Sequence, residues 1–351
     1  MRRQHGVYFT PREIVGAQVR LVDALLRERL GCPTGFADER VLIVDPACGA
    51  GAYPLEIMAL AGDVRTRMRL FEALPGPAAL ARSHGLPVLE ADALGVELVD
   101  QATIVVCIGN PPYRRQTRNS RVLLDGFSEE GGGVHRKNLH NDYVYFWRWA
   151  LRMAFEARRG AAVVCFVTAA SYLRGPAFVG MRRTLRRVLD EMWLIDLEGD
   201  QRAARASANV FPIRTPVAIA LGVRYGDPSL ATPAKVHCTR LSGTSAHKLA
   251  ALSEVRRLED LAWQGVPSGW GEVLHASPRS TYWSWPALTD LFPWQVSGSQ
   301  LKRTWPIGPT PEVLRARWRH LVSLPSPARR MAFGPTRDRD IDARPPDLLD
   351  G

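Results

Sequence analysis

The stretch VLIVDPACGAG, residues 41–51, decides the fold expected for this chain. Its first four residues form a continuous apolar run, which is typical of a strand buried on both faces of a parallel sheet. Pro46 and the glycines then break the run, and residues 55–61 have the pattern of a helix. A strand, a glycine-containing turn and a helix in this order form the opening unit of a doubly wound α/β sheet.

Strands and helices continue to alternate on both sides of this stretch. Residues 12–30 place apolar side chains on one face of a helix, and further helices are expected at 77–83, 143–157 and 182–189. Strands are expected at 68–71, 88–89, 104–108, 161–167, 193–197 and 217–223. This alternation predicts an α/β protein with a doubly wound, mostly parallel sheet. From about residue 226, Pro, Ser, Gly and Trp dominate and the periodicity weakens.

The composition is that of a globular protein. Apolar residues make up 46% of the 351 residues and charged residues 23%, which excludes disordered, collagen-like and coiled-coil chains. Lys and Arg number 46 against 35 Asp and Glu, a formal net charge of +11. This excess indicates a polyanionic partner, nucleic acid first and an anionic membrane surface second. A genomic bias toward Arg codons is the open alternative.

The cysteines and the apolar runs exclude other classes of protein. Five cysteines are dispersed, and none has the spacing of a zinc site or a disulfide framework, so we expect no metal and a reducing, cytoplasmic location. The longest apolar run, residues 161–170, is about half the length of a membrane span. No apolar stretch follows the first residues as in a signal peptide. We therefore expect no membrane segment.

Acids and glycines follow the first three predicted strands. In the turn after the first strand, Gly49 and Gly51 let the backbone approach a ligand and expose amide N–H groups at a helix N-terminus. Asp45, at the end of that strand, can bind an ammonium or hydroxyl group. Glu72 stands where nucleoside-binding doubly wound folds use an acid for ribose hydroxyls. Asp92 either accepts from an adenine amine or caps a helix.

The sequence Asn110-Pro111-Pro112-Tyr113 carries the strongest chemical signal. Its consecutive prolines hold the turn rigid, so that the Asn110 side-chain oxygen and the Pro111 carbonyl face one direction as acceptors. This pair can accept both hydrogens of an exocyclic amine, beside the aromatic ring of Tyr113. The nitrogen lone pair, otherwise delocalised into the ring of the base, is then localised and directed at an electrophile.

Two groups of arginines have different expected roles. Arg114 and Arg115, with Arg118 and Arg121, follow this turn directly, which favours contact with phosphates over a solvated loop. A second group lies on a predicted helix and is expected to form a solvated face: Arg182, Arg183, Arg186 and Arg187.

These motifs resemble those of N6-adenine-specific DNA methyltransferases of the NPPY amino-methyltransferase group. In particular, the chain resembles the methylase region of single-polypeptide restriction–modification enzymes. The resemblance covers about residues 5–225 and is carried by GVYFTP (6–11), DPACGAG (45–51), NPPY (110–113), NDYVYF (141–146), FVT (166–168), SYL (171–173) and NVF (209–211). The chain departs from the family at Ala50, where Ser is usual, and at Tyr53-Pro54, where Phe-Leu is usual.

The resemblance implies a Rossmann-like fold that binds S-adenosylmethionine, and it assigns roles residue by residue. The implied cofactor-binding residues are Tyr8, Thr10, Pro11, Asp45, Ala47, Gly49, Gly51, Glu72 and Asp92. The implied catalytic residues, which hold the target base, are Asn110, Pro111, Pro112 and Tyr113. The expected substrate contacts are Tyr113, Phe211, Arg114 and Arg115.

The expected organisation has three parts. Residues 1–40 form an N-terminal helix with a cofactor-pocket motif, and residues 41–225 form the methyltransferase catalytic domain. Residues 226–351 form a partial target-recognition or linker region, shorter than the family's usual sequence-reading domain. This shortness leaves independent, sequence-specific binding of DNA open.

The implied function is methyl transfer from S-adenosylmethionine to N6 of a flipped-out adenine in double-stranded DNA. We expect it to belong to a restriction–modification or phage-defence system, together with a separate restriction or specificity subunit. Two alternatives stay open. The same motif serves enzymes that methylate glutamine amides of proteins, and the chain could be a catalytically weak subunit that needs a partner.

Overall fold

The computed structural model describes the chain as two compact units, one within residues 1–278 and one within residues 279–351. The residues it describes are 9–98, 102–114, 124–128, 136–199, 207–227, 231–276, 285–286, 291–292, 307–335 and 341. Among these residues, no helix combines the length and the apolar character needed to cross a lipid bilayer.

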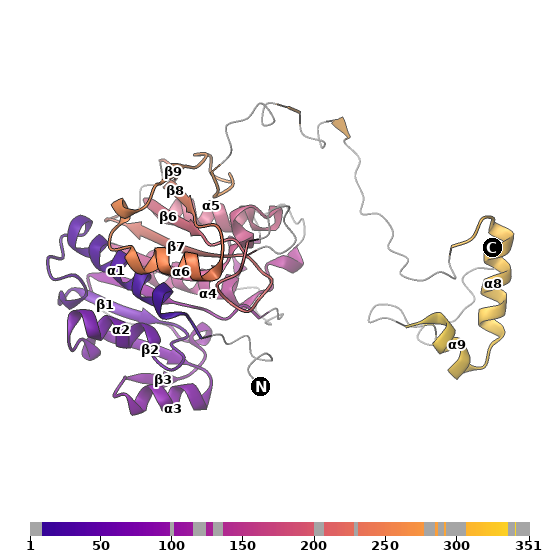
Figure 1. Ribbon diagram of the computed structural model, residues 1–351, viewed down its shortest axis with the longest axis horizontal. Coiled ribbons are helices and arrows are strands. Elements are labelled where there is room, and N and C mark those ends of the chain that lie inside the picture. Colours follow the sequence, from indigo (N-terminus) through magenta and orange to yellow (C-terminus); the bar gives the residue numbers. More distant parts are fainter. Residues whose placement is uncertain are drawn as a thin grey trace. The chain divides into compact units, whose positions relative to one another are not determined.

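One large sheet forms the centre of the first unit. Its strands are β1 (Val41–Asp45), β2 (Met68–Glu72), β3 (Val88–Glu90), β4 (Ile104–Gly109), β5 (Ala162–Ala169), β6 (Glu191–Asp196), β7 (Val217–Arg224), β8 (Lys235–Arg240) and β9 (Gln264–Gly265). They lie in the order β3-β2-β1-β4-β5-β7-β6-β8-β9 (Figure 1). The pairings among β1 to β5 are parallel, as is that of β6 with β8. β7 runs antiparallel between β5 and β6, and β9 antiparallel to β8.

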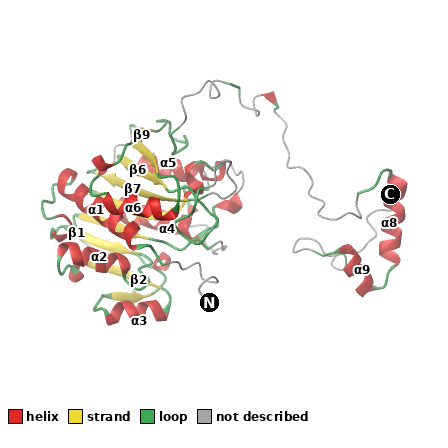
Figure 2. Cartoon of the chain, viewed as in Figure 1, coloured by secondary structure: helices red, strands yellow, loops and turns green. Residues whose placement is uncertain are grey.

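Helices cover both faces of this sheet (Figure 2). They are α1 (Arg12–Arg29), α2 (Ala52–Ala61), α3 (Pro75–Ser83), α4 (Asp142–Leu151), α5 (Val179–Val188) and α6 (Ser245–Glu254). α1, α2, α3 and α6 pack on one face, and α4 and α5 pack on the other. In β1, Leu42 and Val44 face α4, whereas Val41 and Ile43 face α1. The strand is thus buried on both faces, as its continuous apolar run predicts.

The predicted fold class is confirmed, because the sheet is mostly parallel and helices cover both faces. Every strand and helix predicted between residues 12 and 223 overlaps an observed one. The helix predicted at 143–157 consists of α4 and a π-helical turn, Arg152–Glu156. The predicted 55–61 helix begins earlier, with Gly51 as the N-cap of α2.

The expected boundary at residue 225 does not coincide with a division of the structure. β8 extends the sheet by parallel pairing with β6, and α6 packs against α1. Both elements therefore belong to the first unit, and β8 provides hydrogen-bond partners for the backbone groups of β6 on the side away from β7. The division of the chain falls instead between residues 278 and 279.

Two arginines of α5 are buried, so the prediction of a solvated face is wrong for them. Arg182 and Arg186 are 3% and 1% exposed. Arg182 Nη1 donates to the Gly175 carbonyl at 2.8 Å, and Arg186 Nη2 donates to the Pro267 carbonyl at 2.6 Å. The buried guanidinium groups therefore donate to carbonyls of irregular loops.

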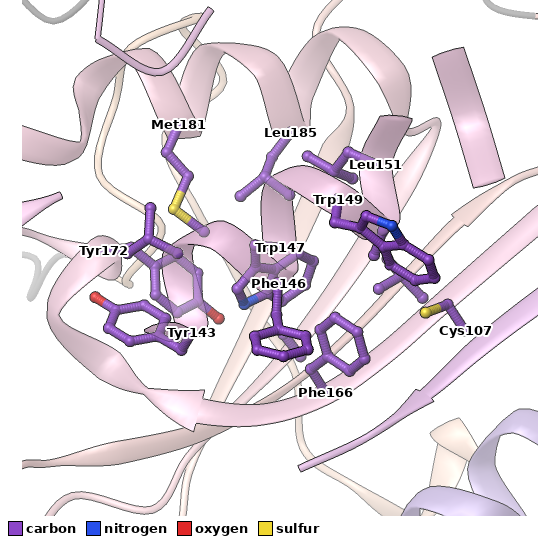
Figure 3. Close-up of a cluster of buried hydrophobic side chains, with 14 of the residues drawn as sticks. Cys107, Tyr143, Phe146, Trp147, Trp149, Leu151, Phe166, Tyr172, Met181 and Leu185 are labelled. Carbon is purple, nitrogen blue, oxygen red and sulfur yellow. The ribbon is translucent and has the colours of Figure 1, made fainter. Parts of the chain in front are cut away.

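A cluster of aromatic side chains anchors α4 to the sheet (Figure 3). Trp147 is completely buried, with its ring 5.2 Å from that of Phe166 and 5.9 Å from that of Tyr172. Trp147 Nε1 also donates to Thr168 Oγ1 at 3.3 Å. At the N-terminus of the helix, the Asp142 N–H donates to the carbonyl of Arg114 at 2.8 Å. The cluster therefore fixes the helix end that holds the turn after β4.

The second unit contains a pair of helices, α8 (Pro311–Ser323) and α9 (Ser326–Phe333). Thr310 caps α8 through a hydrogen bond from the Val313 N–H to its Oγ1. Leu321, Phe333 and Ile341 form its buried apolar cluster.

Candidate active site at the carboxyl edge of the sheet

The predicted site residues meet at one edge of the sheet. β1 ends at Asp45, its neighbour β2 ends at Glu72, and β4 ends at Gly109, directly before Asn110. Because these strands are adjacent and parallel, their carboxyl ends lie side by side. The contact between β1 and β4 is close, since a Cβ added to Gly109 would lie 2.7 Å from Asp45 Oδ1. Glycine at 109 therefore makes room for the Asp45 carboxyl group.

The turn after β1 is left-handed at two glycines. Gly49 has φ +57° and Gly51 has φ +94°, a region that other residues enter at a cost. The turn's amide N–H groups, expected to face a ligand, donate within the protein at four positions. Their acceptors are Asp45 Oδ1 for Ala47, the Phe71 carbonyl for Cys48, Glu72 Oε2 for Gly49 and the Cys48 carbonyl for Gly51. No atom lies within 4 Å of a Cβ added at Gly49, which leaves space beside the turn.

Asp45 is a buried acid with one unpartnered oxygen. It is 1% exposed, and its Oδ1 accepts from the Ala47 N–H at 3.1 Å. Its Oδ2 is buried and has no hydrogen-bond partner. Burial raises the pKa of Asp45 to about 8. The hydrogen bond from the Ala47 amide lowers this pKa, and the nearby charge of Glu72 raises it further. A group that brings a positive charge or a hydrogen-bond donor to Oδ2 would therefore be bound favourably.

Glu72 joins the glycine turn to the end of β2. Its Oε2 accepts from the Gly49 N–H at 3.0 Å, and its Oε1 accepts from the Leu74 N–H at 2.7 Å. Burial raises the pKa of Glu72 above its ordinary range, although these amide hydrogen bonds oppose the shift. Each carboxylate oxygen has a second lone pair, so both can accept a further hydrogen bond.

Asp92 caps a short helix, which is one of the two roles that the sequence leaves open for it. Its Oδ1 accepts from the Leu94 N–H at 3.1 Å and caps the short 3-10 helix Ala93–Gly95. The residue is exposed. Its role at an adenine amine stays a prediction.

Asn110 is held from both ends of its side-chain amide. Its Nδ2 donates to Thr10 Oγ1 at 2.9 Å, and its Oδ1 accepts from the Tyr113 hydroxyl at 2.6 Å. Thr10 comes directly before Pro11, the N-cap of α1, so the start of α1 and the turn after β4 are joined across the site. Thr10 is thus placed against the predicted catalytic amide, as well as in the segment implied to bind the cofactor.

The Tyr113 hydroxyl faces two acceptors with a single hydrogen. It lies 2.6 Å from Asn110 Oδ1 and 3.0 Å from the Val167 carbonyl oxygen. A phenol can donate only one hydrogen bond, so donating to Val167 leaves the Asn110 oxygen free for another donor. The ring of Tyr113 meets that of Phe211 edge to face, with centroids 6.2 Å apart and an interplanar angle of 86°.

Some predicted site residues lie beside this group or outside the described residues. Arg114 points toward Asp142, with Nε 4.0 Å from its Oδ2. Phe211 is 3% exposed. Tyr8 and Arg115 lie outside the described residues. Among the residues that the structure describes, no group of three or more His, Cys, Asp and Glu side chains could hold a metal ion.

A buried polar pair that the sequence patterns did not predict lies near the site. Tyr53 donates from its hydroxyl to Gln18 Oε1 at 2.7 Å, and Gln18 Nε2 donates to the Cys165 carbonyl at 3.2 Å. Tyr53 is 3% exposed and Gln18 is fully buried. Gln18 interrupts the apolar stripe of α1, and this was the signal that could have revealed it. Position 53 holds Tyr where the resembled family usually has Phe, and Gln18 provides a hydrogen-bond partner for the additional hydroxyl group.

Neither a protein-family model nor a curated protein matches this sequence. Solved structures do match its fold. LlaBIII, an ATP-dependent Type ISP restriction-modification enzyme solved bound to DNA, superposes with a TM-score of 0.65 at 20% identity, over 76% of this chain. A nuclease-deletion mutant of the Type ISP enzyme LlaGI, in complex with a DNA substrate mimic, superposes with a TM-score of 0.63 at 19% identity, over 78% of this chain. The DrdV–DNA complex superposes with a TM-score of 0.65 at 22% identity, over 79% of this chain.

This chain spans only a part of those enzymes. The matched regions cover 22% of LlaBIII, 27% of LlaGI and 32% of the DrdV chain. At these identities, the likeness establishes a common fold for the first unit. The shared architecture is the mostly parallel, Rossmann-like sheet whose carboxyl edge carries the candidate site.

Proposed function

We propose that this chain is a site-specific DNA methyltransferase, which transfers the methyl group of S-adenosylmethionine to N6 of adenine. One observation supports this above the others. The turn after β1, the acid after β2 and the Asn110-Pro111-Pro112-Tyr113 turn after β4 lie on adjacent strand ends. A cofactor held by the first two would thus lie beside the amine held by the third.

The cofactor site fits S-adenosylmethionine in its chemistry. Asp45 Oδ2 is a buried acceptor without a partner, suited to the ligand's ammonium group or a hydroxyl. Glu72 lies one strand further, where its oxygens can accept from ribose hydroxyls. Gly49 leaves open space beside the turn. When bound, S-adenosylmethionine supplies an electrophilic methyl group on a sulfonium sulfur.

The turn after β4 supplies the acceptors that activate an aromatic amine. Asn110 Oδ1 is oriented because Nδ2 is held by Thr10. When the Tyr113 hydroxyl donates to the Val167 carbonyl, Asn110 Oδ1 and the Pro111 carbonyl can each accept one hydrogen of the amine. The nitrogen lone pair would then point toward the methyl carbon. Formation of the N–C bond would break the bond between that carbon and the sulfonium sulfur, S-adenosylhomocysteine would leave, and the methylated amine would release one proton to solvent. Catalysis of this kind depends on position and on fixed dipoles.

Double-stranded DNA is the substrate that the charge and the motif favour. The net charge of +11 favours a polyanion, and Arg114 lies directly after the catalytic turn. Flipping an adenine out of the duplex costs a few kcal/mol. Stacking on an aromatic ring such as Tyr113 contributes roughly 1–3 kcal/mol per base, which offsets much of that cost.

We place the activity in a restriction–modification or phage-defence system, where a separate restriction or specificity subunit would be its partner. This placement is supported by the fold shared with LlaBIII and LlaGI, both Type ISP restriction-modification enzymes. The five cysteines are free and buried, which supports a reducing cytoplasm as the location.

The decisive test incubates the purified chain with S-adenosylmethionine and unmethylated DNA, followed by digestion to nucleosides. Mass spectrometry should detect N6-methyladenine with the wild-type chain and none with Asn110→Ala, while calorimetry shows similar cofactor binding by both. Label from the cofactor found in protein instead of DNA would favour the glutamine-amide alternative. Cofactor binding without product in either substrate would favour a subunit that needs a partner.

A further inference from the structure

Lys248 on α6 is a completely buried cation. Its Nζ donates to the Leu197 carbonyl at 2.6 Å, to Ser207 Oγ at 2.7 Å and to the Ala208 carbonyl at 2.7 Å. An ammonium group has three donors, so these contacts satisfy all of them. The acceptors belong to two separate segments, one directly after β6 and one that leads toward β7.

The second of these segments is held by the loop before α6 as well. The Gly243 carbonyl accepts from the Ala208 N–H at 3.2 Å and from Ser207 Oγ at 3.4 Å. α6 and the residues before it thus fix the chain at residues 207–208. An apolar side chain at position 248 could fill the same space, but it would leave two buried acceptors, the Leu197 carbonyl and Ser207 Oγ, and the part-buried Ala208 carbonyl without this donor.

The fixed residues lead directly to the aromatic ring beside the catalytic turn. Asn209 Oδ1 accepts from the Phe211 N–H at 3.0 Å, and its Nδ2 donates to the Thr215 carbonyl at 2.7 Å. This turn places the Phe211 ring edge to face against Tyr113. A continuous series of contacts therefore connects Lys248 to the ring on which the target base would stack.

We propose that Lys248 is a positioning residue for base binding: it anchors the segment that holds Phe211 against Tyr113. The kinetic consequence rests on the DNA methylation proposed above, whereas the anchoring rests on the contacts alone. Residues 235–254 then support the catalytic turn itself, in addition to any role in recognising DNA.

The test compares Lys248→Met with Arg224→Met in the full chain. Arg224 is a suitable control because it is 1% exposed and donates to three carbonyls, of Gly160, Phe155 and Arg158. Arg224 is the last residue of β7 and pairs with Ala162, the first residue of β5. It therefore lies at the end of the sheet opposite to the carboxyl edge that carries the candidate site. Both variants lose a buried cation, but only one loses the anchor of the Phe211 segment.

Hydrogen exchange of the peptide 207–215 gives a result that does not need activity. We expect faster exchange there in Lys248→Met and wild-type exchange in Arg224→Met. Ser207→Ala, which removes one acceptor and keeps the lysine, should give an intermediate increase even if Lys248→Met fails to fold. Unchanged exchange in Ser207→Ala and in a folded Lys248→Met would overturn the anchoring.

Steady-state kinetics on unmethylated plasmid DNA test the positioning. In Lys248→Met, kcat/KM for DNA should fall about tenfold, the size expected when a base–aromatic contact is weakened, with KM for S-adenosylmethionine unchanged. A fall no larger than that in Arg224→Met would overturn the positioning role. If the wild-type chain methylates no DNA, the proposed function fails, and the exchange result still decides the anchoring.

Discussion

The buried carboxyl group of Asp45 makes the stability of the protein depend on pH. In the native protein its pKa is about 8, whereas an Asp in the unfolded chain titrates near 4. Between these values the unfolded chain releases the proton that the native carboxyl group retains. The free energy of unfolding therefore falls as the pH rises from about 4 to about 8, by at most about 1.4 kcal/mol per pH unit from this group.

The variant Asp45→Asn should remove this dependence. We expect urea unfolding of the cofactor-free wild-type chain to show Asp45's contribution as a loss of stability from pH 5 to pH 7, and the variant to show a smaller loss. The difference between the two curves isolates Asp45 from the other titrating groups. Parallel curves would contradict the raised pKa.

Tyr113 allows its ring and its hydroxyl to be tested separately. Tyr113→Phe keeps the ring and frees Asn110 Oδ1 from the phenol, so we expect methylation of DNA to persist within a few-fold. Tyr113→Ala removes the stacking surface and should lower kcat/KM for DNA by tenfold or more. A similar loss in both variants would mean that the hydroxyl, and not the ring, carries the function.

At the scale of elements, the buried Gln18–Tyr53 pair joins α1, α2 and β5. Tyr53→Phe leaves Gln18 Oε1 without its donor, which should destabilise the protein by about 1–3 kcal/mol in chemical unfolding. The double variant Gln18→Leu, Tyr53→Phe removes both partners of that hydrogen bond and should recover part of the loss. A Tyr53→Phe chain as stable as wild type would show that the hydroxyl contributes nothing.

At the scale of the whole molecule, the two compact units should separate in function. A chain that ends at residue 278 keeps the sheet and all described site residues, so we expect it to bind S-adenosylmethionine as the full chain does. It loses five arginines of the α8 and α9 helices, namely Arg315, Arg317, Arg319, Arg329 and Arg330.

DNA binding at several salt concentrations checks this division. If these arginines contact phosphates, truncation weakens binding and lowers the salt slope by about 0.9 per lost contact. An unchanged slope would assign DNA binding to the first unit alone. Loss of cofactor binding would show instead that the first unit does not fold by itself.

The sequence by itself determined the order of the elements up to β7, and it predicted which residues form the site. Continuous apolar runs, glycine turns and helical stripes are local patterns, so β1 to β7 could be read from them. The parallel arrangement followed, and it placed Asp45, Glu72 and Asn110 at one edge. Where the pattern was weak, after residue 225, β8 and α6 were missed, because a short strand and a helix with Lys248 on its buried face have no strong period.

Only the tertiary structure decided which polar groups meet. The amides of the glycine turn bond within the protein, Thr10 holds Asn110, and Lys248 reaches carbonyls about 40 and 50 residues away in the chain. A hydrogen bond depends on distance and direction between atoms, and these are fixed only when segments far apart in sequence pack together. For the same reason, the burial of Arg182 and Arg186 could not be inferred from a charge pattern that fits a solvated helix equally well.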